Sequence, residues 1–185
     1  MSEDSGDDRR FTQRTTLRNG TPVTIRAMHA DDRDRIIAAF HKLEPDSVYT
    51  RFFSFVKEIP AQSLQLLSGI DFEKFGALVV TLGHGNDETV IGGASYVALG
   101  NTDGGKAAEV SFTIEEDYQG QGLASKLLSL LIQTARRHGF TRFEADVLSS
   151  NAPMLKVFER CGLPVRRHSE GGVVHLTMDL SAQAR

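Results

Sequence analysis

The chain has 185 residues and 40% hydrophobic content, which suits a single compact domain. Its formal net charge is −3 and its basic residues form no concentrated stripe, which argues against a nucleic-acid partner. A single cysteine excludes an internal disulfide framework, no metal-ligand cluster stands out, and no apolar run approaches the roughly 20 residues of a membrane span. We therefore expect a cytoplasmic protein that binds neither a membrane nor a metal.

The beginning of the chain is polar and acidic. Residues 1–13 lack apolar periodicity and are predicted to form a flexible tail, and residues 14–181 are predicted to form one domain. Within that domain, residues 15–26 are predicted to form a hairpin. Asn19-Gly20 supplies the positive φ values that a tight primed turn needs.

Helices are predicted next. Asp31 and Asp32 open the first of them, because short carboxylates cap free amides and favour the positive end of the helix dipole. Shorter helical pieces are predicted at residues 45–53 and 60–68. The buried stripe of the first helix is predicted to be Ile36, Ile37, Phe40 and Leu43.

After residue 69 the pattern changes to strands separated by Gly/Asn/Asp turns, and then to alternating helices and strands. This order predicts an α/β fold with a mixed sheet and flanking helices. The predicted strands are residues 76–82, 89–97, 107–114, 140–148 and 173–180, and the predicted helices are residues 122–138 and 153–160.

A glycine loop joins the third strand of this series to its long helix. Gly120 and Gly122 let a ligand approach the backbone closely, and the first-turn amides of the helix can bind a pyrophosphate. The loop has neither a Walker lysine nor the three glycines of a dinucleotide fingerprint, so a general nucleotide-binding domain is disfavoured. By spacing alone, a plain turn is an equal interpretation.

Two longer motifs give the loop a context. Residues 109–124 (EVSFTIEEDYQGQGLA) resemble the central motif of the GNAT superfamily of N-acetyltransferases, a strand and turn followed by Arg/Gln-x-x-Gly-x-Gly/Ala. Gln119, Gly122 and Ala124 match its defining positions. Residues 151–163 resemble the helix that follows in this family, and the resemblance covers about residues 15–180.

A third motif narrows the resemblance. Residues 45–53 (PDSVYTRFF) resemble a phrase found in the GNAT domain of bacterial protein lysine acetyltransferases, which acetylate acyl-CoA synthetases. In that group the domain is often fused to a cyclic-nucleotide sensor or a synthetase-like domain. Because the chain ends shortly after its last predicted strand, we expect no such second domain and no regulation of that kind.

The resemblance implies acetyl-CoA as co-substrate and assigns its groove. Phe112, Thr113 and Ile114 are implied to pair with the pantetheine arm through their backbone, and Asn151 and Lys156 to lie in the second half of the groove. The pyrophosphate is implied to bind to Gln119, Gly120, Gln121, Gly122, Leu123, Ala124 and Ser125.

Glu109 is the predicted general base, since an amine acceptor must lose a proton before it attacks a thioester. It matches the base position of the protein acetyltransferase group, and we expect its partial burial in an apolar strand to suit that role. The alternative is an ordinary strand glutamate that faces solvent or pairs with Lys106. Glu115 and Glu116 are interpreted as solvated turn carboxylates.

Other reactive side chains receive weaker interpretations. Phe158 stands where many family members place a proton-donating tyrosine, and Tyr118 is too close to the glycine loop for that role to be assigned. Cys161 is interpreted as a packing residue rather than a nucleophile. His138 is interpreted as a surface residue, and Arg51 as either substrate-facing or part of an amphipathic turn.

The predicted function is acetyl transfer from acetyl-CoA to a primary amine, with a protein lysine as the favoured acceptor. A small-molecule amine is the alternative acceptor and would need a deeper, closed pocket, whereas a protein needs an open groove. A non-catalytic acyl-CoA-binding module is the alternative class, which an intact Glu109 disfavours. Edge strands of the sheet offer a homodimer contact.

Overall fold

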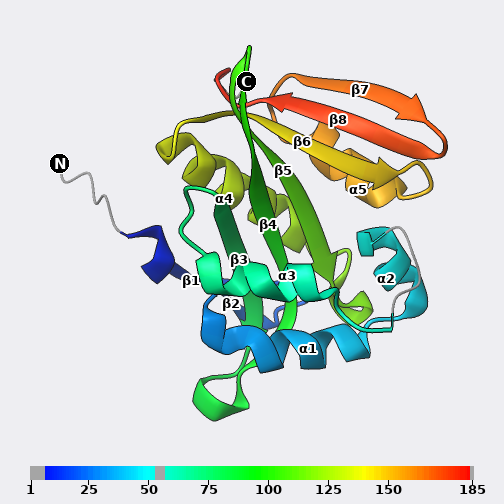
Figure 1. Ribbon diagram of the computed structural model, residues 1–185. Coiled ribbons are helices and arrows are strands. Elements are labelled where there is room, and N and C mark those ends of the chain that lie inside the picture. Colours follow the sequence, from blue (N-terminus) through cyan, green and yellow to red (C-terminus); the bar gives the residue numbers. More distant parts are fainter. Residues whose placement is uncertain (1–6, 53–56, 184–185) are drawn as a thin grey trace.

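The computed structural model describes residues 7–52 and 57–183 of the chain. In this part of the chain, eight strands form one sheet in the order β1-β2-β3-β4-β5-β6-β8-β7 (Figure 1). Neighbouring strands are antiparallel except for β5 and β6, which are parallel, so the predicted mixed sheet is confirmed. The strands are β1 (Thr12–Thr16), β2 (Pro22–Ala27), β3 (Phe75–Leu82), β4 (Thr89–Thr102), β5 (Gly105–Ile114), β6 (Phe140–Leu148), β7 (Val165–Glu170) and β8 (Val173–Asp179).

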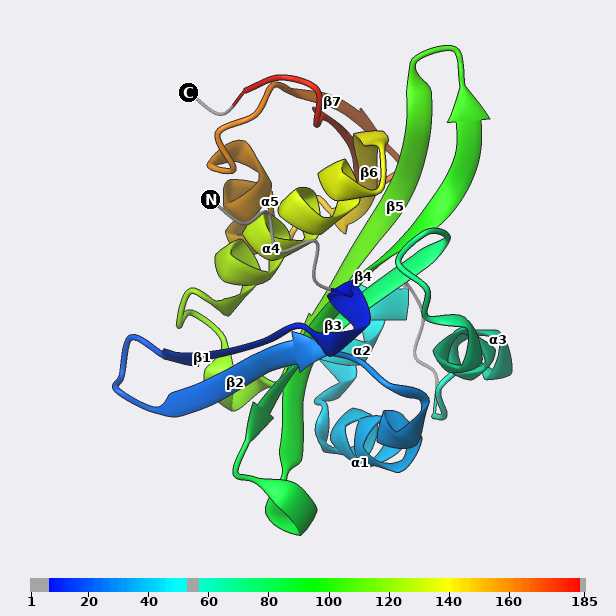
Figure 2. The same ribbon diagram turned by 90° about the vertical axis from the view of Figure 1, so that its left-hand side faces the viewer.

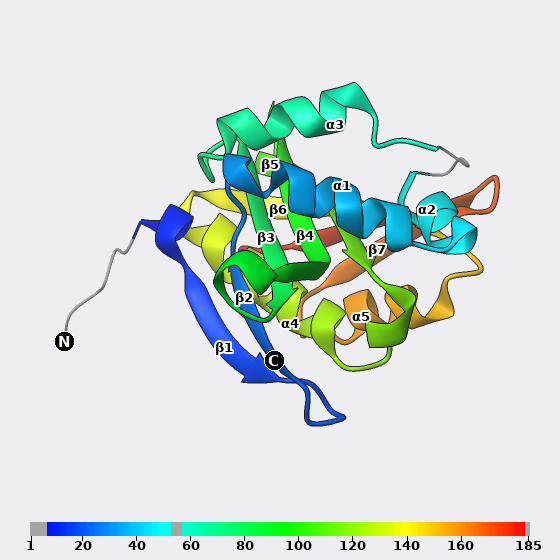
Figure 3. The same ribbon diagram turned by 90° about the horizontal axis from the view of Figure 1, so that it is seen from below.

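Helices cover both faces of the sheet. Figure 2 and Figure 3 show α1, α2 and α3 on one side of the central strands and α4 and α5 on the other. The α-helices are α1 (Arg33–Lys42), α2 (Pro45–Phe52), α3 (Ala61–Gln65), α4 (Leu123–Arg137) and α5 (Ala152–Glu159). Short 3₁₀ turns are η1 (Asp8–Arg10), η2 (Ala30–Asp32), η3 (Leu66–Gly69), η4 (Gly85–Asp87) and η5 (Glu116–Tyr118).

The long helix α4 forms one wall of the core. Its apolar residues recur every three to four positions, so they share one face of the helix and pack on the sheet. Tyr96 and Phe143 meet this face from the strands, and their ring centroids lie 5.8 Å apart. The buried residues of the helix are Leu123, Leu127, Leu128, Leu131, Ile132, Thr134 and Ala135.

The predicted hairpin is confirmed, but its predicted turn type is wrong. The Leu17 N–H donates to the Thr21 carbonyl at 2.8 Å, and the Gly20 N–H donates to the Leu17 carbonyl at 3.0 Å. Gly20 has φ +89°, whereas Asn19 is not among the positive-φ residues of the described chain, so the turn is not primed. The Asn19 side chain instead accepts the Thr21 N–H at 3.0 Å, an arrangement typical of asparagine in turns.

Strand β7 was not predicted. Five of its six residues are exposed and polar, so it lacks the apolar alternation of a half-buried strand. It forms one edge of the sheet, where charged side chains discourage pairing with other chains. Gly171 and Gly172, both at positive φ, turn the chain from β7 into β8 and were the signal that could have revealed it.

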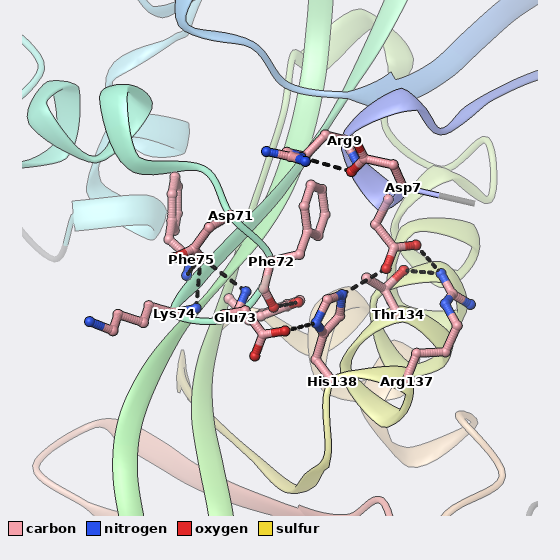
Figure 4. A network of polar contacts seen from close by, with 12 residues as sticks. Asp7, Arg9, Asp71, Phe72, Glu73, Lys74, Phe75, Thr134, Arg137 and His138 are labelled. Carbon is pink, nitrogen blue, oxygen red and sulfur yellow. Dashed lines mark hydrogen bonds and ion pairs between the residues drawn. The ribbon is translucent and has the colours of Figure 1, made fainter. Parts of the chain in front are cut away.

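The predicted tail of residues 1–13 is wrong for residues 7–13, while residues 1–6 lie outside the described chain. The Asp8 carboxylate lies 2.7 Å from His138 Nε2 at the end of α4. On the other side, the Glu73 carboxylate lies 2.8 Å from Nδ1 of the same ring, a contact that Figure 4 shows. His138 is therefore held between two carboxylates and is not the surface residue that was expected. These partners are up to 130 residues apart, so local composition could not indicate the contact.

Candidate active site

Strands β5 and β6 run together only over their first residues. Residues 106–109 of β5 pair with residues 140–144 of β6, and the last pair is Glu109 with Glu144. Beyond it, residues 110–114 pair with β4 alone and residues 145–148 with β8 alone. The two strands therefore splay apart after Glu109, and we call this separation the splay. It leaves a row of β5 backbone groups without a strand partner, and such groups can bind an extended ligand arm.

The glycine loop lies between this splay and α4. Gly120 and Gly122 have φ values of +72° and +87°, a left-handed conformation that favours glycine. Gly122 is also the N-cap residue of α4, and no side chain caps the helix there. The free amides and the positive dipole end of α4 are therefore available to an anionic ligand.

A groove of about 580 Å³ runs from the splay to this helix end. Gln121 does not line the groove, because its side chain accepts the backbone N–H of Asn19 at 3.0 Å. The Gln119 amide lines it and donates to the Ile114 carbonyl at 2.9 Å, which holds the loop against β5. The predicted cofactor residues that line the groove are Phe112, Thr113, Ile114, Gln119, Gly120, Gly122, Leu123, Ala124, Ser125, Asn151 and Lys156.

Sequence reasoning missed several polar residues of the groove, among them Arg18, Ser47, Arg160 and the carboxylates of Glu44 and Asp46. Arg18 comes from the hairpin and donates to the Gly120 carbonyl at 3.3 Å. Ser47 of α2 and Arg160 after α5 lie along the same groove, so Arg18 from the hairpin and Lys156 and Arg160 from α5 and its end supply positive charge. No local motif marks Arg18, which lies 102 residues before Gly120.

The position expected for a proton-donating tyrosine holds a core residue. Phe158 is 1% exposed and packs edge-to-face on Phe112, with ring centroids 5.8 Å apart. It therefore supports the groove wall from beneath and offers no proton. Tyr118 does line the groove, next to the glycine loop.

A second hollow lies on the opposite face of the sheet. It has a volume of about 240 Å³ and is bounded by α1, α3 and strands β3 to β5, which Figure 1 shows crossing one another. Its walls are mostly apolar. Arg51, Glu109 and Glu115 are the charged residues among those described that line it, and we call it the acceptor cavity.

Glu109 lies at the splay and lines the acceptor cavity, but its expected partial burial is wrong, since the residue is exposed. The alternative partner, Lys106, is also excluded, because its ammonium contacts Glu73 at 3.4 Å and the His138 carbonyl at 3.1 Å. Glu109 therefore lies between the groove and the acceptor cavity, and its carboxylate does not pair with Lys106.

The interpretation of Glu115 as a solvated turn residue is wrong. Glu115 lies in the turn directly after β5, where it continues the cavity-facing row, but it is half-buried, and its N–H donates to the Ile91 carbonyl at 2.9 Å. Burial raises the pKa of its carboxyl, Lys42 opposes that rise, and Asp117 and Glu116 add to it.

The structure locates Arg51 and Cys161 relative to the groove and the acceptor cavity. Arg51 lines the acceptor cavity, where burial lowers the pKa of its guanidinium and the nearby charge of Glu109 raises it, so the substrate-facing interpretation is supported. Phe53, in the same motif, lies outside the described residues. Cys161 is half-buried and lines a separate hollow between α4 and α5, so it faces neither the groove nor the cavity.

The described residues contain neither a metal-ligand cluster nor a helix suited to a bilayer. No group of three or more His, Cys, Asp or Glu side chains in residues 7–52 and 57–183 is arranged to hold a metal ion. Over the same residues, no helix is long and apolar enough to cross a bilayer.

These features define a protein that binds an extended, pyrophosphate-bearing ligand in a split sheet. The profile of the Acetyltransferase (GNAT) family matches residues 43–163. Acetyltransferase Pat of Mycolicibacterium smegmatis is 32% identical over 158 residues, 85% of this chain and 46% of that protein. Acetyltransferase PA5475 of Pseudomonas aeruginosa is 31% identical over 139 residues, 75% of this chain and 73% of that one.

A solved structure supports the same family assignment. The GNAT domain of S. lividans PAT superposes with a TM-score of 0.80 at 31% identity, covering 91% of this chain and 96% of that one. The chain belongs to the GNAT family of acetyltransferases. The predicted family, fold class and enzyme class are thereby confirmed, and acetyl-CoA is the co-substrate of that class. The chain spans about half the length of the Mycolicibacterium relative.

Proposed function

We propose that this chain transfers an acetyl group from acetyl-CoA to a protein lysine by direct attack, with Glu109 as the general base. The observation that carries this proposal is the position of Glu109 at the vertex of the splay. The groove for an acyl-CoA lies on one side of this point, and the acceptor cavity lies on the other. The resemblance of residues 45–53 to protein lysine acetyltransferases supports the choice of lysine.

The groove supplies binding and orientation. The amides of the first turn of α4 and the loop at Gly122 bind the pyrophosphate, and Arg18 adds a cation on the far side. The unpaired backbone of residues 110–114 binds the pantetheine arm as a strand would. This places the thioester close to the vertex, because the arm runs from the glycine loop toward Glu109.

The reaction then removes two protons from the acceptor nitrogen and exchanges a C–S bond for a C–N bond. Glu109 takes a proton from the acceptor ammonium, and the neutral amine attacks the thioester carbonyl. The new C–N bond forms, the C–S bond breaks, the acylated nitrogen gives up its second proton to solvent, and CoA leaves as a thiolate that takes a proton from solvent. Phe158 cannot donate that proton, and no dedicated acid is needed because a thiolate is a good leaving group.

A small amine is the second candidate acceptor. The acceptor cavity favours it, because this hollow lies between α1, α3 and the sheet and is lined mostly by apolar side chains. Such a hollow admits an aliphatic amine more readily than a folded protein surface. Turnover with protein lysines and with free amines distinguishes the two candidates.

The proposal is tested by acetyl-CoA binding to two glycine variants. Gly122→Ala and Gly139→Ala both place a Cβ at positive φ, with φ values of +87° and +78°, so each should cost about 1–2 kcal/mol of stability. Gly122 lines the groove, whereas Gly139 lies beyond α4. Calorimetry should show acetyl-CoA binding weakened at least about tenfold by Gly122→Ala and unchanged by Gly139→Ala. Equal binding by both variants, or no binding by the unmodified chain, would refute the assignment of the groove as the acetyl-CoA site.

A further inference from the structure

Strand β5 presents a row of polar side chains to the acceptor cavity. Alternate residues of a strand share one face, so four residues spaced by two lie in line. We call this row, Glu109, Ser111, Thr113 and Glu115, the polar stripe; all four line the cavity. The Ser111 hydroxyl lies 3.3 Å from that of Ser95 on β4, which extends the polar surface sideways.

The polar stripe faces an apolar roof. Ile36 and Phe40 of α1, and Leu43 directly after it, line the cavity, and Phe40 is buried. The cavity therefore offers hydrocarbon contact along its middle and one carboxylate at each end. An aliphatic chain with a cationic group at each end matches that pattern.

The carboxylate of Glu115 has no cation bound to it among the described residues. No side-chain hydrogen bond or ion pair joins it to residues 7–52 or 57–183, although it is half-buried. A half-buried carboxylate gains from a close cationic partner; the nearby charge of Lys42 acts on Glu115 without a hydrogen bond, and a ligand ammonium would supply one. The charged side chains lining the cavity are two carboxylates and the Arg51 guanidinium, a balance that favours a cationic ligand.

We propose that the acceptor cavity binds a short aliphatic diamine, with one amino group at Glu109 and the other held as an ammonium by Glu115. The acetylation of this diamine rests on the proposed function, whereas its binding does not. In the reaction, the amino group at Glu109 loses a proton and bonds to the acetyl carbon as the C–S bond breaks. The products are an N-acetyl diamine and CoA.

The size of the cavity sets the length of the diamine. The cavity, of about 240 Å³, is lined by Glu109 and by Glu115. Six residues of strand separate the Cα atoms of Glu109 and Glu115 by roughly 20 Å, so a chain of eight atoms spans the gap only when both side chains lean inward. Affinity should therefore pass through a maximum as the diamine is lengthened.

The test is calorimetry without acetyl-CoA, which separates binding from turnover. Hexamethylenediamine should bind at least about tenfold more tightly than n-hexylamine, and Glu115→Gln should reduce this ratio to about one. Asp117→Asn removes an exposed carboxylate that lines neither the groove nor the cavity, and should leave the ratio unchanged. Equal affinity for the two amines, or an unchanged ratio in Glu115→Gln, would overturn the proposed site.

Turnover then separates the two proposals. Mass spectrometry of the diamine after incubation with acetyl-CoA should show a gain of one acetyl group. Binding that depends on Glu115 with no transfer to any amine would refute the proposed function and leave the binding site standing. Transfer to a protein lysine alone would overturn the role of the diamine as acceptor.

Discussion

Replacing Glu109 by Gln removes the carboxylate at the vertex of the splay and keeps its shape. Glu109 is exposed and is not hydrogen-bonded through its side chain within the described residues, so stability should change by less than about 0.5 kcal/mol. A general base typically contributes about 10²–10⁴-fold, which corresponds to about 2.7–5.4 kcal/mol of activation free energy. We therefore expect kcat to fall by that factor while the affinity for acetyl-CoA is retained.

The assay is the release of free CoA thiol at saturating acetyl-CoA, followed as a function of pH. The rate in Glu109→Gln should be lower than that of the unmodified chain by about 10²–10⁴-fold across the pH series. Glu144→Gln is the matched control, because Glu144 is the direct cross-strand partner and pairs with Arg142 at 3.0 Å. Equal losses in both variants would refute the assignment, and a loss of this size only in Glu115→Gln would move the base to Glu115.

Three other changes have measurable consequences. Arg18→Ala should weaken acetyl-CoA binding about tenfold in calorimetry at low salt, and less at high salt because the exposed charge is screened. Asp32→Asn should lower the unfolding free energy by about 3 kcal/mol in urea titration, since it breaks a buried pair with Arg26 at 2.7 Å. Burial alone would raise the pKa of Asp32, but the Arg26 hydrogen bond and a backbone N–H lower it below the ordinary 3.8, so this contribution should be present above about pH 4 and lost as the pH falls further. Tyr96→Phe should cost about 1–3 kcal/mol in the same titration, because the buried carbonyl of Phe72 loses its 2.6 Å hydrogen bond.

Most elements of the fold could be predicted because their signals are local. The leucines of α4 recur with the helical period, and Gly139 marks its end, so this helix was predicted to within a residue or two. Strand β7 was missed because its outward residues are charged and only the neighbouring β8 makes it a strand. The folding of residues 7–13 onto His138 was missed for the same reason, since the contact joins distant segments.

The features of the candidate site also fall into those that contiguous sequence predicts and those that only tertiary packing creates. The glycine loop, the helix N-terminus and the strand before them are contiguous, so the phosphate-binding half of the groove could be recognised from residues 109–125 alone. The sequence also shows that Glu109 and Glu115 are an even number of positions apart, but it does not show that both line one cavity. Only the tertiary structure decided that α1 and α3 cover that face of β5, that Arg18 reaches the loop, and that β5 and β6 separate at Glu109. Periodicity and turn chemistry act between near neighbours, whereas a cavity depends on which distant segments pack together.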